Sequence, residues 1–430
     1  MRDLLIFLVF LSFFWYGLRA PFVLLLGYVW VDIFTPQLVS YGLLRSIPVS
    51  QVIGIAALLS LVFKPPPIRL LGNRTIFLMF VFGCWMTLTL LWAAVPDAAF
   101  EKWNWALKNV WVACLVPLFI RGRIELEALI WTIVLAGMAN CIPFGIKILI
   151  SGGGYGHAKG LIEANSGYGE GSTLAMFAVS LIPLCFYLMK HSQIIPTNKS
   201  VKLMLWGFIF AALLTSLGTF ARTGLVSAAI LGIALLLRSK RKLQYITMIS
   251  IAVPVFGFIM GDQWADRMST ISSDTDSSSM GRVAAWLWAW EYVQSNPLGG
   301  SFGVAKINHF LLTLSSGDIL EINGKAFHNI FFEVLAETGF PGITIYSLII
   351  VSSILALNHT RKIASLPGHD WLRDISATML ITILIFLTGG MFIGVAFQSY
   401  FYYLAAISVV IVNISVADAT NVLSRSVGIK

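Results

Sequence analysis

Apolar runs recur along almost the whole chain, and short polar loops separate them. Most runs are about as long as the roughly 17–25 residues that an α-helix needs to cross a bilayer. The pattern predicts about twelve membrane helices, at 4–34, 49–63, 75–92, 104–120, 125–150, 172–189, 203–218, 223–237, 243–260, 329–357, 374–392 and 397–415. We therefore expect an all-α integral membrane protein.

The composition excludes a water-soluble fold. Of the 430 residues, 58% are hydrophobic and only 11% are charged, whereas soluble domains carry about 25% charged residues. The net charge of +9 does not indicate nucleic-acid binding, because the sequence has no RNA-binding motif and no basic arm with interleaved aromatic residues. The four cysteines fall in predicted membrane helices without the spacing of a zinc or disulfide site, so we interpret them as small core residues.

The first apolar run, 4–34, is too long for one straight crossing, and Arg19 and Pro21 interrupt it. Hydropathy alone allows one bent span or two short ones. If both termini lie on the cytoplasmic side, the inner loops carry more than twice as many lysines and arginines as the outer loops. This bias favours one net crossing for residues 4–34.

Two predicted outer segments are long: the glycine-rich stretch 151–172 and the stretch 261–328. The second divides the chain into an N-terminal membrane bundle (1–260), one large outer loop region (261–328) and C-terminal membrane helices (329–430). Part of this loop has a helical pattern, and its three tryptophans suit an interfacial helix near the lipid headgroups: Trp286, Trp288 and Trp290.

His328 stands where the outer loop meets an apolar run, in GKAFHNIFFEVLAETGFPG. The ordinary pKa of histidine, near 6.5, suits proton transfer at neutral pH. A lone histidine in this place can equally be a polar cap where a helix meets water. Glu337, inside the same run, can pair with an arginine or orient the histidine.

Two arginines lie on the predicted outer side, against the charge bias of the loops. Arg222, in GTFARTG, is either an interfacial anchor or faces a polar cavity. Arg282 opens the predicted interfacial helix, where its charge is unfavourable unless an anion binds nearby. A diphosphate would be a suitable anion, and a surface arginine is the alternative.

The sequence gives little support for a metal or a cofactor. Asp274 and Asp276, in DTD, have the spacing of a metal-binding pair but stand among serines without a supporting pattern. His309 and His328 have no third ligand at helical spacing. We therefore expect no metal site and no cofactor.

Three motifs resemble those of the O-antigen ligase and polymerase superfamily. FHNIFFEVLAETGFPG is similar to its H-N/S-x(7)-E-x-G-x-x-G signature, with matches at His328, Asn329, Glu337, Gly339 and Gly342. TFARTG resembles its short arginine motif, although alanine replaces the usual serine before Arg222. GRVAAWLWAWEYVQSNPLGGSFG is similar to its R-x(3)-W…P-x-x-G-x-G segment, with matches at Arg282, Trp286, Pro297, Gly300 and Gly303.

The runs MRDLLIFLVFLS and FLMFVFGCWMTLTLLWA further resemble the branch called exosortase-associated O-glycosylation ligases. The resemblance implies an enzyme of the bacterial inner membrane whose active site faces the periplasm. It implies metal-independent transfer of a glycan from undecaprenyl diphosphate to a sugar hydroxyl of lipid A–core. On the matched positions, His328 would be the base and Arg222 and Arg282 would hold the diphosphate, with three substrate-binding residues beside them: Glu337, Asn329 and Trp286.

Other functions stay open at this point. An O-antigen polymerase or a protein O-oligosaccharyltransferase of the same superfamily would use the same donor chemistry with another acceptor. A transporter could also have about twelve spans, but transporters place charged or broken segments near the bilayer midplane. The notable charges here lie at the predicted outer edge instead.

Overall fold

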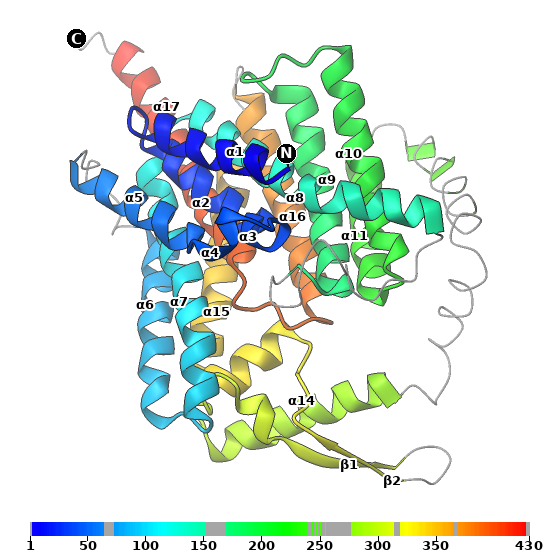
Figure 1. Ribbon diagram of the computed structural model, residues 1–430. Helices are drawn as coiled ribbons and strands as arrows, with labels where there is room; N and C mark the ends of the chain where they lie inside the picture. The colour runs from blue at the N-terminus through cyan, green and yellow to red at the C-terminus, as the bar shows by residue number, and fades with distance from the viewer. Residues whose placement is uncertain are drawn as a thin grey trace.

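The computed structural model describes residues 2–63, 73–151, 168–239, 277–313, 319–363 and 369–426, with a few isolated residues between 242 and 254. These parts of the chain are mostly helical (Figure 1). The helices are α1 (Arg2–Gly17), α2 (Phe22–Phe34), α3 (Pro36–Val39), α4 (Leu43–Ser46), α5 (Val49–Phe63), α6 (Arg74–Thr89), α7 (Pro96–Phe119), α8 (Arg123–Ser151), α9 (Gly171–His191), α10 (Lys199–Gly218), α11 (Arg222–Arg238), α14 (Ser277–Ser295), α15 (Ile330–Ile363), α16 (Asp370–Gly390) and α17 (Ser399–Ser426).

Seven of the described helical segments are long and apolar enough to cross a membrane: Arg74–Trp92, Arg123–Ile150, Gly171–His191, Lys199–Gly218, Ile330–Lys362, Asp370–Gly390 and Ser399–Asp418. The chain is therefore a multi-pass, all-α membrane protein. The predicted count of about twelve spans is not confirmed. The apolar helices α2 and α5 are shorter, and most of the predicted span 243–260 lies outside the described residues.

The long helices alternate in direction, which gives the bundle two distinct ends. At one end Arg123, at the start of α8, donates a hydrogen bond to the carbonyl oxygen of His191 at the end of α9 (3.0 Å). Lys190 forms an ion pair there with Asp374 near the start of α16 (2.5 Å). We call this the basic end, because ten described basic residues gather there: Arg74, Arg121, Arg123, Lys190, Lys199, Lys202, Arg238, Arg361, Lys362 and Arg373.

The opposite end holds the starts of α9, α15 and α17, together with the end of α16 and the whole of α14. Gly390, at the end of α16, packs against Ile330 at the start of α15, and Gly389 packs against Met176 near the start of α9. We call this the site end, and it lies at the bottom of Figure 1. The division of charge between the two ends agrees with the loop bias in the sequence.

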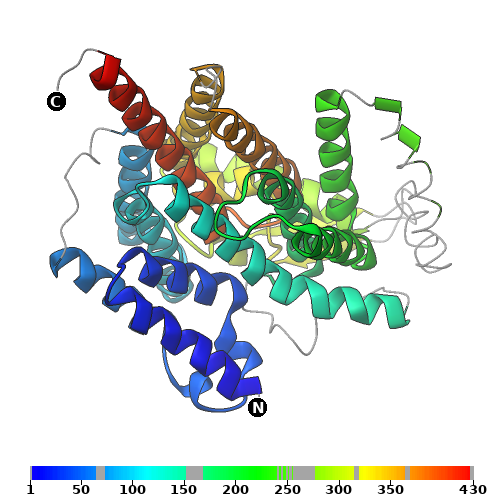
Figure 2. The ribbon, with the colours of Figure 1, turned by 90° about the horizontal axis from the view of Figure 1, so that it is seen from above.

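Helices α1 and α2 form an antiparallel hairpin, seen side by side at one edge of the bundle in Figure 2. Gly17 packs against Leu24, and Gly27 packs against Phe13. Asp3 accepts a hydrogen bond from the backbone N–H of Tyr41, which lies beyond the end of α2 (2.9 Å). Residues 4–34 therefore do not make the one net crossing that the loop charges favoured. The chain reverses at the Arg19–Pro21 break, and each helix is shorter than a bilayer requires.

The outer loop region contains a two-stranded antiparallel sheet that the sequence did not predict. Its strands β1 (His309–Thr313) and β2 (Ile319–Asn323) pair in a register that places His309 opposite Asn323. Helix α14 packs on α15, and its buried positions, four residues apart, form one stripe: Ala285, Ala289 and Val293.

The three tryptophans of α14, which suit an interfacial helix, differ in their surroundings. Trp286 stacks on Phe332 with ring centroids 5.5 Å apart, and Trp288 stacks on Tyr292 at 4.8 Å. Only Trp290 is exposed, together with Val283 and Leu287 on the same helical face. An interfacial position for α14 is compatible with this exposed apolar face, but two of the tryptophans are packing residues.

Helix α15 is kinked at Gly339, whose φ of 68° is in the left-handed region that favours glycine. The segment NPLGG crosses the kink so closely that a Cβ on Gly299 would lie 2.5 Å from the backbone nitrogen of Gly339. Hydrogen bonds from Gly300 N to Ala336 O and from Phe340 N to Pro297 O, both 2.9 Å, join the two segments. This crossing fixes the first half of α15, which carries Glu333 and Glu337, at the site end.

Candidate active site

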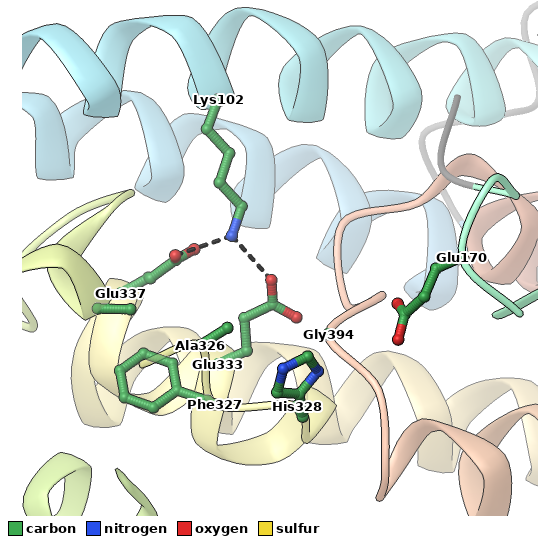
Figure 3. Close-up of a pocket in the computed structure, with 9 residues that line it drawn as sticks. Lys102, Glu170, Ala326, Phe327, His328, Glu333, Glu337 and Gly394 are labelled. Carbon is green, nitrogen blue, oxygen red and sulfur yellow. Dashed lines mark hydrogen bonds and ion pairs between the residues drawn. The ribbon is translucent and has the colours of Figure 1, made fainter. Parts of the chain in front are cut away.

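A cavity of about 150 Å³ opens at the site end of the bundle. It lies between α7, the start of α15, the residue before α9 and the connection from α16 to α17 (Figure 3). Its walls are formed by Lys102, Glu170, Ala305, Ala326, Phe327, His328, Glu333, Glu337 and Gly394. Four charged side chains and one imidazole therefore share a small space.

His328 is half-buried in this cavity, and Figure 3 shows its imidazole between Glu333 and Glu170. Its backbone has a φ of +47°, a left-handed conformation that is uncommon outside glycine and tends to occur at functional sites. Burial and the nearby guanidinium of Arg282 lower the pKa of His328, while Glu170 acts in the opposite direction. The imidazole is therefore neutral at neutral pH and able to accept a proton.

Two neighbours hold the His328 segment in place. Asn329 caps α15, since its Oδ1 accepts hydrogen bonds from the backbone N–H groups of Phe331 (2.9 Å) and Phe332 (3.4 Å). Trp286 donates a hydrogen bond from Nε1 to the carbonyl oxygen of Phe327 (2.6 Å). Both were predicted as substrate-binding residues, but the contacts seen here position the backbone around His328.

Lys102 is the centre of the charged cluster, and its sequence pattern did not predict a place in the site. Its Nζ donates to Oε1 of Glu333 at 2.7 Å and to Oε1 of Glu337 at 2.8 Å. The ammonium also lies 5.1 Å from the ring centroid of Phe397, within cation–π range. Glu333 and Glu337 are four residues apart and so share one face of a helix, where two carboxylates repel each other unless a cation lies between them. This spacing was the sequence feature that could have indicated a basic partner such as Lys102.

Glu337 pairs with a lysine, whereas the sequence analysis considered an arginine. Its Oε1 also accepts a weak hydrogen bond from the backbone N–H of Gly303 (3.3 Å), but among the described residues its Oε2 has no partner. Glu333, which the sequence analysis gave no role, also holds the α16–α17 connection, because its Oε2 accepts from the N–H of Ala396 (3.1 Å). Glu337 and His328 both line the cavity.

The two predicted arginines occupy different positions around the cavity. Arg282, half-buried on α14, is close enough for its charge to lower the pKa of His328. Arg222 begins α11, whose first turn packs on the first turn of α9, since a Cβ on Gly224 would lie 3.2 Å from that of Ala175. Arg222 therefore lies at the site end, near the helix that Glu170 precedes, but it does not line the cavity.

The weak metal candidates gain no support. Asp274 and Asp276 lie outside the described residues. His309 pairs with Glu321 on the exposed hairpin (3.0 Å). Within the part of the chain that the structure describes, no three potential ligands are grouped so that they could hold a metal ion.

The fold and the cavity define a multi-pass membrane protein with a charged, histidine-containing site at one end of its bundle. Residues 207–347 match the family model described as O-Antigen ligase. The matched stretch therefore resembles the O-antigen ligase family, and it includes Arg222, Arg282, His328 and Glu337. The exosortase-associated branch stays a prediction.

A second family model, for a family of unknown function (DUF5935), matches residues 1–193. This region supplies Lys102 and Glu170, so the cavity is built from both matched parts of the chain. No curated protein matches the chain.

Proposed function

We propose that the protein is an O-antigen ligase of lipopolysaccharide biosynthesis, which moves a glycan from undecaprenyl diphosphate to a sugar hydroxyl of lipid A–core. The observation that carries this proposal is the position of His328. His328 lines a charged cavity, the Arg282 guanidinium is close enough to lower its pKa, and both residues lie in the stretch that matches the O-antigen ligase model.

In this reaction the acceptor oxygen attacks the anomeric carbon of the glycan. The bond from that carbon to the diphosphate oxygen breaks, and the electron pair leaves with undecaprenyl diphosphate. The hydroxyl proton passes to the imidazole of His328, which later returns it to water. Because the attack is direct, the configuration at the anomeric carbon inverts.

The negative charge that develops on the leaving diphosphate must be offset. Arg282 and Arg222 suit this role because guanidiniums stay charged and bind phosphate oxygens in pairs. Fixed cations can supply this stabilisation without a metal ion. We therefore expect transfer to continue in excess EDTA, and a loss that a divalent ion restores would contradict this part of the proposal.

The charge distribution supports a periplasmic active site. Basic residues near the membrane favour the cytoplasmic side, and they gather at the basic end of the bundle. His328 and the cavity lie at the opposite end. Placing the basic end in the cytoplasm of a bacterial inner membrane directs the cavity to the periplasm, where both lipid-linked substrates would be present.

The test is a transfer assay with the purified protein in lipid nanodiscs. Undecaprenyl-diphosphate-linked glycan is offered together with lipid A–core, a second lipid-linked glycan or a serine-containing peptide. Transfer to lipid A–core supports the ligase. Preference for the second glycan would identify a polymerase, and preference for the peptide a protein O-oligosaccharyltransferase. Movement of the intact donor across the bilayer, without transfer to any acceptor, would indicate a transporter.

A further inference from the structure

The cavity beside His328 has the wrong charge for a diphosphate. Three carboxylates line it, from Glu170, Glu333 and Glu337, against the single ammonium of Lys102. Carboxyl groups outnumber the ammonium three to one in this lining, so a phosphate placed among them would be repelled. The donor diphosphate therefore belongs on the Arg282 side of His328, and the cavity is left for another group.

One of these three carboxyl groups is incompletely hydrogen-bonded. Glu337 is only 2% exposed, and its Oε2 has no hydrogen-bond partner within the described ranges. A buried carboxylate oxygen without a partner is costly, so it calls for a donor such as a hydroxyl group. Glu170 offers a second carboxylate across from Glu333, on the far side of His328 (Figure 3).

A metal ion does not fit the place between the two buried carboxylates. Lys102 Nζ already lies 2.7 Å from Glu333 and 2.8 Å from Glu337, where a bound cation would have to sit. The volume of about 150 Å³ corresponds to roughly ten water-sized positions. This is comparable with one hexose ring and its hydroxyl groups.

We propose that this cavity is the acceptor subsite, and that it binds an uncharged sugar through its hydroxyl groups while rejecting a phosphorylated sugar. The inference rests on the proposed function for its role in transfer, but the binding preference follows from the cavity alone. A hydroxyl of the sugar donates to Oε2 of Glu337 and another donates to Glu170. The reacting hydroxyl then faces His328, with the donor diphosphate held on the other side.

Binding and transfer are measured separately, so that each idea can fail alone. Binding uses monoglucosyl diacylglycerol and its 6-phosphate, each added without donor to the protein in nanodiscs. Transfer uses undecaprenyl-diphosphate-linked glycan with the same two acceptors and with lipid A–core. The variants are Glu337→Gln and Glu170→Gln, and the matched control is Glu291→Gln, which makes the same change at an exposed position on α14.

A hydrogen bond to a charged group is worth about a tenfold change in affinity or more. We expect Glu337→Gln to weaken glucoside binding and to raise the acceptor KM by about tenfold, with the donor KM unchanged. Glu170→Gln should give a smaller change of the same kind and should stay informative if Glu337→Gln does not fold. Wild-type protein should bind the 6-phosphate about 100-fold more weakly than the neutral glucoside, and Glu291→Gln should behave as wild type.

Equal affinity for the two glucosides would overturn the inference, and so would a rise in donor KM with unchanged acceptor KM in both cavity variants. If the wild type transfers glycan but the variants bind the glucoside normally, the subsite is wrong and the proposed function stands. If the neutral glucoside binds as expected but no acceptor receives glycan, the proposed function is wrong and the sugar site stands.

Discussion

The substitution Lys102→Met tests the charged cluster directly. Lys102 is the cation between two carboxylates whose side chains are only 9% and 3% exposed, at Glu333 and Glu337. Removing one member of a buried ion pair costs about 3–5 kcal/mol, because the other charge is left without compensation. The lysine side chain itself is 28% exposed, which places the expected loss near the lower limit, at about 3 kcal/mol.

Thermal unfolding in nanodiscs measures this loss. In a chain of this length 1 kcal/mol corresponds to about 2 °C or less in Tm, so Lys102→Met should lower the Tm by about 5 °C. Glu337→Gln in the same background should cost less than it does alone, because it removes one of the two repelling carboxylates. Lys306→Met, at an exposed lysine of the site end, is the control and should change stability by less than about 0.5 kcal/mol.

A Tm for Lys102→Met within 1 °C of wild type would refute the reasoning. Additive effects of Lys102→Met and Glu337→Gln would refute it as well, since side chains joined by a 2.8 Å ion pair must be coupled.

Three further outcomes follow from the site. Burial and Arg282 lower the pKa of His328, so transfer should fail as pH falls, with a midpoint below 6.5. Arg282→Gln should move this midpoint upward. An unchanged pH profile of kcat/KM in this variant would show that Arg282 does not act on His328. Trp286→Phe removes the hydrogen bond to the carbonyl oxygen of Phe327 but keeps an aromatic ring against Phe332. The kcat should therefore fall, and the free energy of unfolding should decrease by about 1 kcal/mol. The control Trp290→Phe, at an exposed position, should leave kcat unchanged. Gly339→Ala would place a Cβ 2.3 Å from the carbonyl oxygen of Pro297, so folded protein should be lost in size-exclusion chromatography, while Gly122→Ala, with nothing within 4 Å, should fold normally.

The membrane class was predictable because a long apolar run in lipid must satisfy its backbone hydrogen bonds internally, and an α-helix is the structure that does so. The sequence singles out His328 and Arg282 because a titratable or charged group at the end of an apolar run is costly without a use. The structure places Arg282 close enough for its charge to act on His328, and their catalytic roles stay predictions. It gives Asn329 and Trp286 contacts with the backbone, which spacing in sequence does not reveal.

Lys102 was not predicted because its partners are more than 230 positions away in the chain. Only the folded structure brings the Lys102 side chain of α7 to these glutamates at the start of α15. The hairpin of α1 and α2 was missed for a related reason, since loop charges report which side a loop prefers but not whether a short helix completes a crossing. The β1–β2 pair consists of two five-residue segments, and such short runs carry little periodic signal.

The central claim is that His328 accepts the proton of the acceptor hydroxyl. Its most direct test is the single-turnover rate of glycan transfer from undecaprenyl diphosphate to lipid A–core, compared between wild type and His328→Gln of equal Tm. The account predicts transfer by the wild type and a rate lower by about 10²–10⁴-fold in the variant. Equal rates would contradict it.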